Sequence, residues 1–348
     1  MPDPSELMTR LGLANPVIQA PMAGAGTPAL ASAASRAGSL GSLGAALMPP
    51  DAIRQAIQET RRATDRLFSI NLLLVAPPLI DPARIERMRA RLRPHFERLG
   101  IDPAGIPPPS PPPFGFADQL EVVVEERVPV FSFAFGIPGA AAIARLKAAG
   151  TFVIGAATSV TEARQLAAAG VDAVVAQGLE AGGHRATFAH SFDDGMIPLP
   201  SLVGEIVGAI DLPVIASGGL SDARQIARIM DLGAQAVQIG TLFLACAETA
   251  IPGAYRSRVL KGGETVITRA YTGRPARALR TAFTDDLDGD AEIPDFPVQA
   301  MLTAPLREAA AERGDAFSEY LPMLAGTGVG HGTAGPAADV LDRLTGRR

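Results

Sequence analysis

Short runs of consecutive apolar residues recur along this chain and alternate with segments of helical periodicity. The runs cover residues 17–20, 40–43, 68–74, 129–133, 152–155, 172–177, 213–216 and 236–239. Continuous apolar runs are typical of parallel strands buried on both faces, whereas strands with one wet face alternate. Alternating strands and helices indicate an α/β fold with a parallel sheet, and eight such units favour a closed (β/α)8 TIM barrel.

Helix start and stop signals lie between these runs. Ser159, with Glu162 three residues later, is a capping-box pattern for a helix that stops at Gly170. Ser221 is the expected N-cap of a later helix, which stops at Gly233. These signals separate successive strands by single helices, as a barrel requires.

Two segments are too long for a minimal barrel. Residues 75–127, between the third and fourth strands, hold a charged helix over 82–99 and the proline run 107–113. This run predicts a stiff surface spacer, with a ligand for a proline-binding partner domain as the alternative. Residues 250–325 follow the eighth strand. We expect two domains, namely a barrel of residues 1–249 with 326–348 and a smaller, mostly helical or irregular, substrate-side domain of residues 250–325.

Composition argues against several classes of function. The formal net charge is −5, and no basic run exceeds the pairs Arg61-Arg62 and Arg347-Arg348, so we expect no nucleic-acid partner. A single cysteine, Cys246, rules out a disulfide framework and is expected in the core. The first residues lack the pattern of a secretory signal, and the longest apolar stretches are too short to span a bilayer. We therefore expect a cytoplasmic protein without membrane contact.

Glycines follow the seventh and eighth predicted strands. Ser217-Gly218-Gly219 comes after the seventh, and Gly240-Thr241 follows the eighth at the start of a short helix. In α/β barrels these two loops commonly hold a phosphate through backbone N–H groups and a helix N-terminus. The pattern predicts a phosphate site for a mononucleotide-sized cofactor, because no Rossmann fingerprint follows any strand.

The run from Gln177 to His184 is the sharpest candidate for a catalytic centre. Gly182 and Gly183 let backbone approach a flat ligand, and His184 adds a group that titrates near neutral pH. Gln177 and Asn71 place amides at strand ends, where they bind either the edge of a cofactor ring or backbone. The turn 20–24 contains Met22, which packs either against a ring system or in the core.

The other histidines have no supporting pattern. His95 lies in the first long excursion and is expected at the surface, and His190 and His331 lie in loops. With four histidines, one cysteine and no spaced carboxylate cluster, we expect no metal site.

Together these segments resemble the nitronate monooxygenases, formerly called 2-nitropropane dioxygenases, over nearly the whole chain. The resemblance is carried by NPVIQAPMAG (15–24), SLGSLGA (39–45), FSINLLL (68–74), VPVFSFAFG (128–136), AQGLEAGGHR (176–185), PVIASGGL (213–220), AVQIGTLFL (236–244) and TRAYTGRPARAL (268–279). Members of that family are FMN-dependent (β/α)8 enzymes that oxidise alkyl nitronates with O2 to a carbonyl compound and nitrite. Thr327 is a departure, since glutamine is frequent there.

The resemblance implies roles for individual residues. His184 matches the catalytic histidine, which would remove the α-proton of a neutral nitroalkane, and Thr272 would wall the substrate pocket. The residues implied in FMN binding are Ala20, Met22, Asn71, Gln177 and Gly182 for the ring and Gly218, Gly219, Gln238, Gly240 and Thr241 for the phosphate, to which the loop patterns add Gly183 and Ser217. The expected partners are a small nitronate or nitroalkane and O2.

Three other functions share parts of this pattern. The main alternative is an FMN enzyme that uses NAD(P)H, of the quinone reductase or enoyl-acyl-carrier-protein reductase type. An inosine-monophosphate-dehydrogenase-like enzyme needs a cysteine after the sixth strand, where this chain has none. A non-catalytic flavin-binding barrel is the third. The sequence determines neither the physiological substrate nor the oligomeric state, for which a homodimer is one option.

Overall fold

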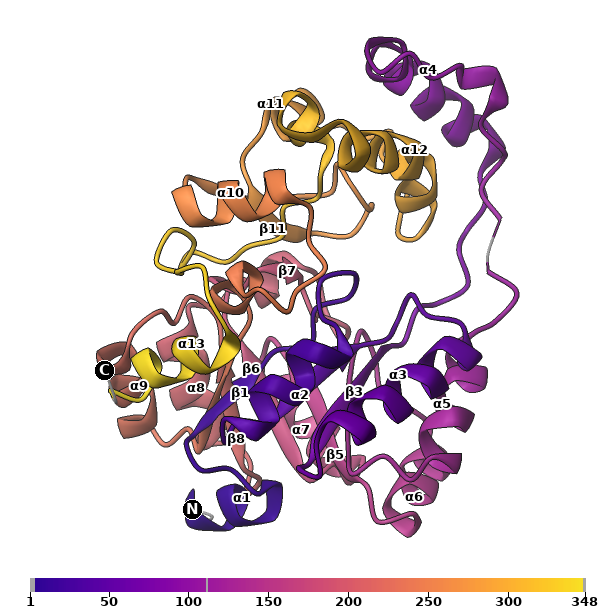
Figure 1. The fold of residues 1–348 in the computed structure, drawn as a ribbon. Helices are drawn as coiled ribbons and strands as arrows, with labels where there is room; N and C mark the ends of the chain where they lie inside the picture. Colours follow the sequence, from indigo (N-terminus) through magenta and orange to yellow (C-terminus); the bar gives the residue numbers. More distant parts are fainter. Residues whose placement is uncertain (1–3, 111, 347–348) are drawn as a thin grey trace.

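The computed structural model describes residues 4–110 and 112–346. Eight parallel strands form one sheet in the order β1-β9-β8-β6-β5-β4-β3-β2, and a parallel bridge between Ile18 and Leu40 joins its two ends (Figure 1). These strands are β1 (Val17–Gln19), β2 (Gly41–Gly44), β3 (Phe68–Leu73), β4 (Val130–Ala134), β5 (Phe152–Ala157), β6 (Ala173–Gln177), β8 (Val214–Ser217) and β9 (Ala236–Ile239). The predicted (β/α)8 TIM barrel is confirmed, and each strand end lies within two residues of its predicted position.

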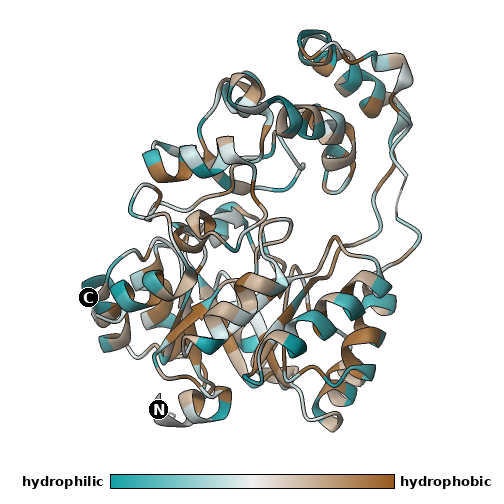
Figure 2. Cartoon of the chain, viewed as in Figure 1, coloured by the Kyte–Doolittle hydropathy of each residue, from teal (hydrophilic) through white to brown (hydrophobic). Residues whose placement is uncertain are grey.

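Helices surround this barrel. They are α2 (Pro28–Arg36), α3 (Pro50–Ala63), α5 (Phe116–Glu125), α6 (Ala140–Ala148), α7 (Val160–Ala168), α8 (Leu199–Val207), α9 (Ala223–Asp231) and α13 (Ala337–Leu344). Their apolar faces and the strands form the largest hydrophobic cluster, which includes the fully buried Leu30, Ile57, Leu166 and Leu202 and the free thiol of Cys246. Figure 2 shows hydrophobic residues along the strands and a mixture of hydrophobic and polar residues on the helices. None of the helices described here is long and apolar enough to cross a membrane.

A further helix, α1 (Pro4–Leu11), lies at one end of the barrel (Figure 1). Its residues Leu7 and Leu11 are buried in a separate cluster with strand residues that include Ile154 and Ile215. This packing fills the end of the barrel opposite the carboxyl ends of the strands. In α/β barrels the active site lies at the carboxyl end, so the site must be sought there.

The N-terminus of α9 is capped by a different residue than expected, and α7 has the predicted N-cap without the full capping box. Asp222, not Ser221, is the N-cap of α9, because its carboxylate accepts from the backbone N–H groups of Arg224 and Gln225. Ser159 does cap α7 by accepting from the backbone N–H of Glu162, as predicted. The Glu162 carboxylate does not complete the capping box, since it is buried and bonded elsewhere.

A second hydrophobic cluster lies above the carboxyl end of the barrel, as Figure 1 shows for α10, α11 and α12. Its elements and nearby short helices are α4 (Pro82–Arg98), η1 (Pro103–Gly105), η2 (Asp193–Gly195), η3 (Thr241–Ala245), α10 (Gly253–Lys261), β10 (Thr265–Thr268), β11 (Ala276–Leu279), α11 (Ala282–Asp286), α12 (Val298–Arg313) and η4 (Gly314–Tyr320). Helix α4 contributes Ile85, Met88, Leu92 and Phe96 to this cluster, although it precedes β4 in the chain.

His95 is not a free surface residue, contrary to the expectation. Its Nε2 lies 2.9 Å from an Asp286 carboxylate oxygen, and its Nδ1 lies 3.2 Å from the Tyr320 hydroxyl. The ring also meets Phe283 edge-on, with centroids 5.0 Å apart. His95 therefore joins α4 to α11 and η4, which explains its half-buried position.

The proline run, residues 107–113, follows α4 and η1 in the chain. Arg89 donates to the carbonyl oxygens of Ile106 and Pro107, which fixes the start of the run beside α4. Residues 107–110, 112 and 113 have no regular secondary structure and are mostly exposed, which agrees with the predicted spacer. Pro111 lies outside the described residues.

Candidate active site

His184 lies on a short strand of its own rather than in an open loop. This strand, β7 (Gly183–His184), pairs antiparallel with β11, which pairs with β10. The His184 Nε2 lies 2.9 Å from the Thr272 hydroxyl, and the His184 carbonyl accepts from Gln177 Nε2 at 3.0 Å. The histidine is thus held from the barrel side by β6 and from the second cluster by β11 and Thr272.

Aromatic rings surround the imidazole. The ring centroids of Phe135 and Phe296 lie 6.0 and 5.6 Å from that of His184, and 6.2 Å from each other. Phe135 has a backbone φ of 75°, which is costly for a residue with a Cβ and recurs at functional sites. The Arg274 guanidinium carbon lies 3.6 Å from the Phe135 ring centroid, in cation–π contact.

Burial and positive charge keep His184 neutral. Burial, followed by the charges of Arg274 and Arg307, lowers the pKa of His184 to about 4. At pH 7 the imidazole therefore carries one proton and one free lone pair, and that lone pair is able to accept a proton from a ligand.

Arginines with no carboxylate partner surround this histidine. Arg185, Arg274, Arg277 and Arg307 form no ion pair with any residue in the described part of the chain. Burial lowers the pKa of Arg185 and of Arg274 to about 10, so both stay charged at neutral pH. The site carries an excess of positive charge, which favours anionic ligands.

Three of these arginines brace the backbone of the histidine loop. Arg185 is fully buried and donates to the carbonyl oxygens of Gln177, Gly178 and Gly195 at 2.7–3.0 Å. Arg277 donates to the Leu179 carbonyl through both Nε and Nη2. Arg274 donates to the carbonyl oxygens of Arg185 and Thr187. Charge-assisted bonds of this kind are stronger than neutral ones, so the loop is firmly placed.

A buried carboxylate fixes the far side of the same loop. Glu162 is 0% exposed and accepts from the backbone N–H and hydroxyl of Thr158. Its other oxygen accepts from the backbone N–H groups of Phe188 and Ala189. Four donors offset the cost of burying this charge.

The glycine loops after β8 and β9 meet a third loop at residues 325–328. The Thr241 hydroxyl accepts from the Gly326 N–H at 2.9 Å, so its own hydrogen remains available for a ligand. The Thr327 N–H donates to the Glu180 carbonyl at 3.0 Å. The backbone N–H groups of Gly218 and Gly219 have no partner among residues 4–110 and 112–346. Unpaired N–H groups in such loops are typical anion ligands.

The remaining predicted residues lie at the same end of the barrel. A methyl group on Gly240 would lie 3.4 Å from Ala20 Cβ and 3.7 Å from Met22 Sδ, so the loops after β1 and β9 touch. Asn71 pairs in register with Gly44 of β2, and its amide donates to the Ser132 hydroxyl on β4 at 2.9 Å. Gln177 uses its amide oxygen to accept from the Ala186 N–H, which leaves it mainly a brace for the histidine loop. Ser217 and Gln238 are register partners on β8 and β9.

Sequence reasoning missed several residues of this arrangement. Phe135, Arg274 and Gly326 lie inside segments that carried the family resemblance or its departure, but no local pattern marks their contacts. Phe296 and Arg307 lie in residues 250–325, where no motif was recognised. Aromatic or glycine residues directly after a barrel strand, such as Phe135 after β4, are the one usable signal.

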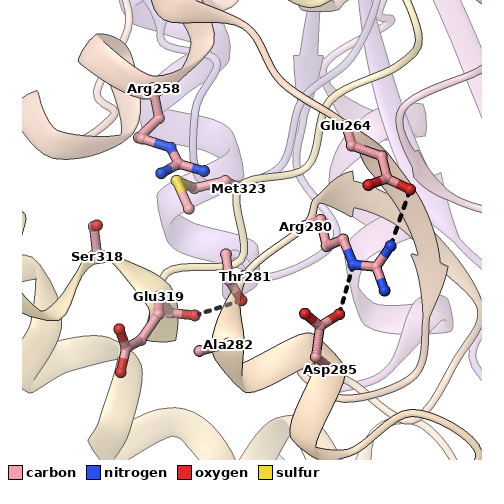
Figure 3. Close-up of a pocket in the computed structure, with 9 residues that line it drawn as sticks. All are labelled: Arg258, Glu264, Arg280, Thr281, Ala282, Asp285, Ser318, Glu319 and Met323. Atoms are coloured by element: carbon pink, nitrogen blue, oxygen red, sulfur yellow. Dashed lines mark hydrogen bonds and ion pairs between the residues drawn. The ribbon is translucent and has the colours of Figure 1, made fainter.

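A cavity of about 420 Å³ lies elsewhere in the second cluster (Figure 3). It is lined by Arg258, Glu264, Arg280, Thr281, Ala282, Asp285, Ser318, Glu319 and Met323. Arg280 pairs there with Glu264 and Asp285, as Figure 3 shows. Its lining carries two arginines and three carboxylates, and none of the predicted site residues is among them, so the cavity is distinct from the histidine site.

Comparison with known proteins identifies the family. The family model described as nitronate monooxygenase matches residues 5–346. This chain belongs to the nitronate monooxygenase family. A nitronate monooxygenase of Paraburkholderia phytofirmans is 42% identical, over 97% of this chain and 93% of the relative. A probable nitronate monooxygenase of Staphylococcus saprophyticus is 39% identical, over 91% of each chain. The members of the nitronate monooxygenase family are flavoproteins.

Solved structures agree with this assignment. The nitroalkane oxidase of Streptomyces ansochromogenes has a TM-score of 0.90 and 38% identity, over 98% of this chain and 97% of that one. FabK from Thermotoga maritima has a TM-score of 0.74 and 31% identity, over 97% and 94% of the two chains. Members of the nitronate monooxygenase family and FabK therefore share the barrel, with the nitroalkane oxidase structure much the nearer of these two.

We expect Gly182→Ala to separate the loops that meet beside His184. A methyl group there would lie 2.4 Å from Gly326 N and 2.6 Å from the Ala325 carbonyl carbon, and backbone cannot yield as a side-chain tip does. Overpacking of this kind costs about 1–3 kcal/mol. Bound flavin per polypeptide, measured by absorbance, should fall. Gly139→Ala is the control, because a methyl group there meets nothing within 4 Å; equal flavin content in both variants would contradict the prediction.

Proposed function

We propose that this chain is an FMN-dependent nitronate monooxygenase that oxidises alkyl nitronates with O2 to a carbonyl compound and nitrite. It accepts neutral nitroalkanes after His184 removes the α-proton. The observation that carries the proposal is a half-buried, neutral imidazole at the carboxyl end of the barrel, under the charges of Arg274 and Arg307, which form no ion pair among the described residues. This arrangement suits a substrate that is an anion or becomes one.

Donor groups in the loops suit a flavin mononucleotide. The unpaired N–H groups of Gly218 and Gly219 and the Thr241 hydroxyl would hold its single phosphate. Ala20, Met22, Asn71 and Gly182 would border the ring. Held by these residues, FMN would supply the electron-transfer chemistry between nitronate and O2, whereas the protein would supply binding, orientation and electrostatics.

The proton-transfer atom of His184 follows from its hydrogen bonds. The Thr272 hydroxyl lies 3.4 Å from the Arg274 carbonyl, to which it donates, and 2.9 Å from His184 Nε2. The hydroxyl then accepts from Nε2–H, and Nδ1 keeps the lone pair that takes the substrate proton. Thr272 acts on the substrate by fixing this tautomer.

Positive charge affects the acid and the base in opposite ways. Arg274 and Arg307 lower the pKa of His184, which makes it a weaker base. The same charges stabilise the nitronate that forms, which makes the nitroalkane a stronger acid in the site. The net effect favours proton removal as long as the anion lies near the arginines.

One experiment separates this proposal from the NAD(P)H reductase alternative. Purified protein is mixed anaerobically with ethyl nitronate, NADH or NADPH, and flavin absorbance is followed. Bleaching by the nitronate alone, with nitrite and O2 consumption under air, is the expected result. Rapid bleaching by NADH or NADPH without nitronate oxidation would replace the proposal with the reductase.

We expect the acid limb of the pH profile to lie well below 6.5. The pKa of His184 is lowered to about 4, so the base form persists as pH falls through 6.5 and is lost only near pH 4. The plot of kcat/KM for nitroethane should stay flat from pH 8 to about 5 and then decline. A limb centred near 6.5 would show that the imidazole is not held neutral by its surroundings.

A further inference from the structure

Arg307 makes fewer hydrogen bonds within the described part of the protein than the other three arginines of the site. Arg185 and Arg274 each donate to two or more carbonyls near His184, and Arg277 donates to the Leu179 carbonyl and to Thr265 on β10. Among residues 4–110 and 112–346, Arg307 makes one hydrogen bond, from Nη2 to the Ala300 carbonyl at 2.6 Å. Its Nε is buried without a partner in the described residues. Arg307 is half-buried, and its Nε–H is a buried donor without a partner, which is costly unless a ligand accepts from it.

The position of the guanidinium follows from that single bond. Arg307 and Ala300 are seven residues apart on α12, which is about 10 Å along the axis at ~1.5 Å per residue. The side chain therefore runs back toward the N-terminal end of α12, the usual direction for long helical side chains. Phe296 precedes this end, and its ring contacts the imidazole of His184. The charge of Arg307 is in turn felt at His184.

Helix α12 is firmly attached to the segment that holds the histidine. Gln299 donates to the Ala270 carbonyl at 2.8 Å, and the Thr303 hydroxyl donates to the Tyr271 carbonyl at 2.6 Å. Thr272, which bonds to His184, is the next residue along. Residues 299, 303 and 307 recur at the four-residue spacing of one helix face. Arg307 is thereby presented toward the same side as the residues that touch the histidine segment.

We propose that Arg307 binds the negatively charged nitro group of the substrate and selects the nitronate anion over the neutral nitroalkane. A planar guanidinium matches two oxygens on one atom through paired N–H donors, as it does for carboxylates. This inference rests on the proposed function and names the residue that determines its substrate form. Arg274 is less suited, because its nitrogens already hold the loop and its face covers Phe135.

The test uses the flavin-loaded enzyme and the variants Arg307→Gln and Arg307→Lys. We expect Arg307→Gln to raise KM for ethyl nitronate about 10- to 100-fold and KM for nitroethane by less than about 3-fold. The kcat for nitroethane should fall, because the charge that stabilises the forming nitronate is lost. Arg307→Lys should recover part of the loss, since it keeps the charge but not the fork. Arg313→Gln, an exposed arginine on the same helix, controls for net charge.

A second readout does not depend on turnover. Nitrate, a planar anion with the same paired oxygens, is titrated into each enzyme while the flavin spectrum is recorded. We expect the nitrate Kd to rise at least 10-fold in Arg307→Gln and to stay unchanged in Arg313→Gln. Unchanged nitrate binding and an unchanged KM for nitronate in Arg307→Gln would overturn the inference. A wild-type enzyme that binds nitrate through Arg307 yet does not oxidise nitronates would instead refute the proposed function.

Discussion

Replacing His184 with alanine should lower kcat/KM for nitroethane by about 10²- to 10⁴-fold, the usual contribution of a positioned general base. Ethyl nitronate, whose α-proton is already gone, should lose much less. The ratio of the two losses, measured as nitrite release under air, reports the proton-transfer role directly. Flavin should be retained, because the glycine loops after β8 and β9 do not depend on the imidazole.

His331→Ala is the matched control for that result. His331 is exposed, and its hydrogen bonds among the described residues are made by its backbone, whose N–H donates to the Gly328 carbonyl and whose carbonyl accepts from Arg343. Its replacement should leave both substrates unaffected. Equal losses on nitroethane and ethyl nitronate in His184→Ala would show that the histidine anchors the anion rather than removing a proton.

The second large effect is expected at Arg185, which never touches the substrate. Arg185→Met removes the donors of the Gln177, Gly178 and Gly195 carbonyls inside the protein. The free energy of unfolding should fall by on the order of 3 kcal/mol, because hydrogen bonds to a buried charged group are among the costliest to lose. Urea unfolding measures this change, and activity should fall with it because the loop carries His184.

An exposed arginine, Arg224, provides the control for Arg185→Met. Arg224→Met makes the same chemical change on the surface of α9, where the side chain forms no hydrogen bond among the described residues. It should alter stability by less than about 0.5 kcal/mol. Arg185→Lys should lie between wild type and Arg185→Met, because an ammonium keeps the charge but cannot reach three carbonyls at once. Wild-type stability in Arg185→Met would mean that Glu162, Arg274 and Arg277 are sufficient to hold the loop.

The barrel could be predicted from sequence because its physical cause is local. A strand that is buried on both faces must be apolar throughout, and that property is visible in each run by itself. The rule that barrel sites lie after the strands then placed His184, Gly218, Gly219 and Thr241 at one end. These predictions needed no knowledge of which distant segments meet.

What could not be predicted depends on contacts between distant segments. Ile85, Met88, Leu92 and Phe96 recur at helical spacing, so α4 visibly needs an apolar partner. The spacing does not say that this partner is the cluster formed by residues 250–325. The role proposed for Arg307 could not be predicted either, because it depends on a buried N–H donor that has no partner in the described residues, and a sequence does not show hydrogen bonds.

Because β7 pairs with β11, the position of His184 depends on a segment that lies outside the barrel strands. By chain order His184 belongs to the barrel, yet its strand partner is Ala276 of β11, which follows the eighth barrel strand in the chain. A movement of β11 away from the barrel would have to break its pairing with Gly183 and His184 or displace His184 with it. A barrel without residues 250–325 would therefore lack both the strand that pairs with β7 and the Thr272 hydroxyl that contacts His184.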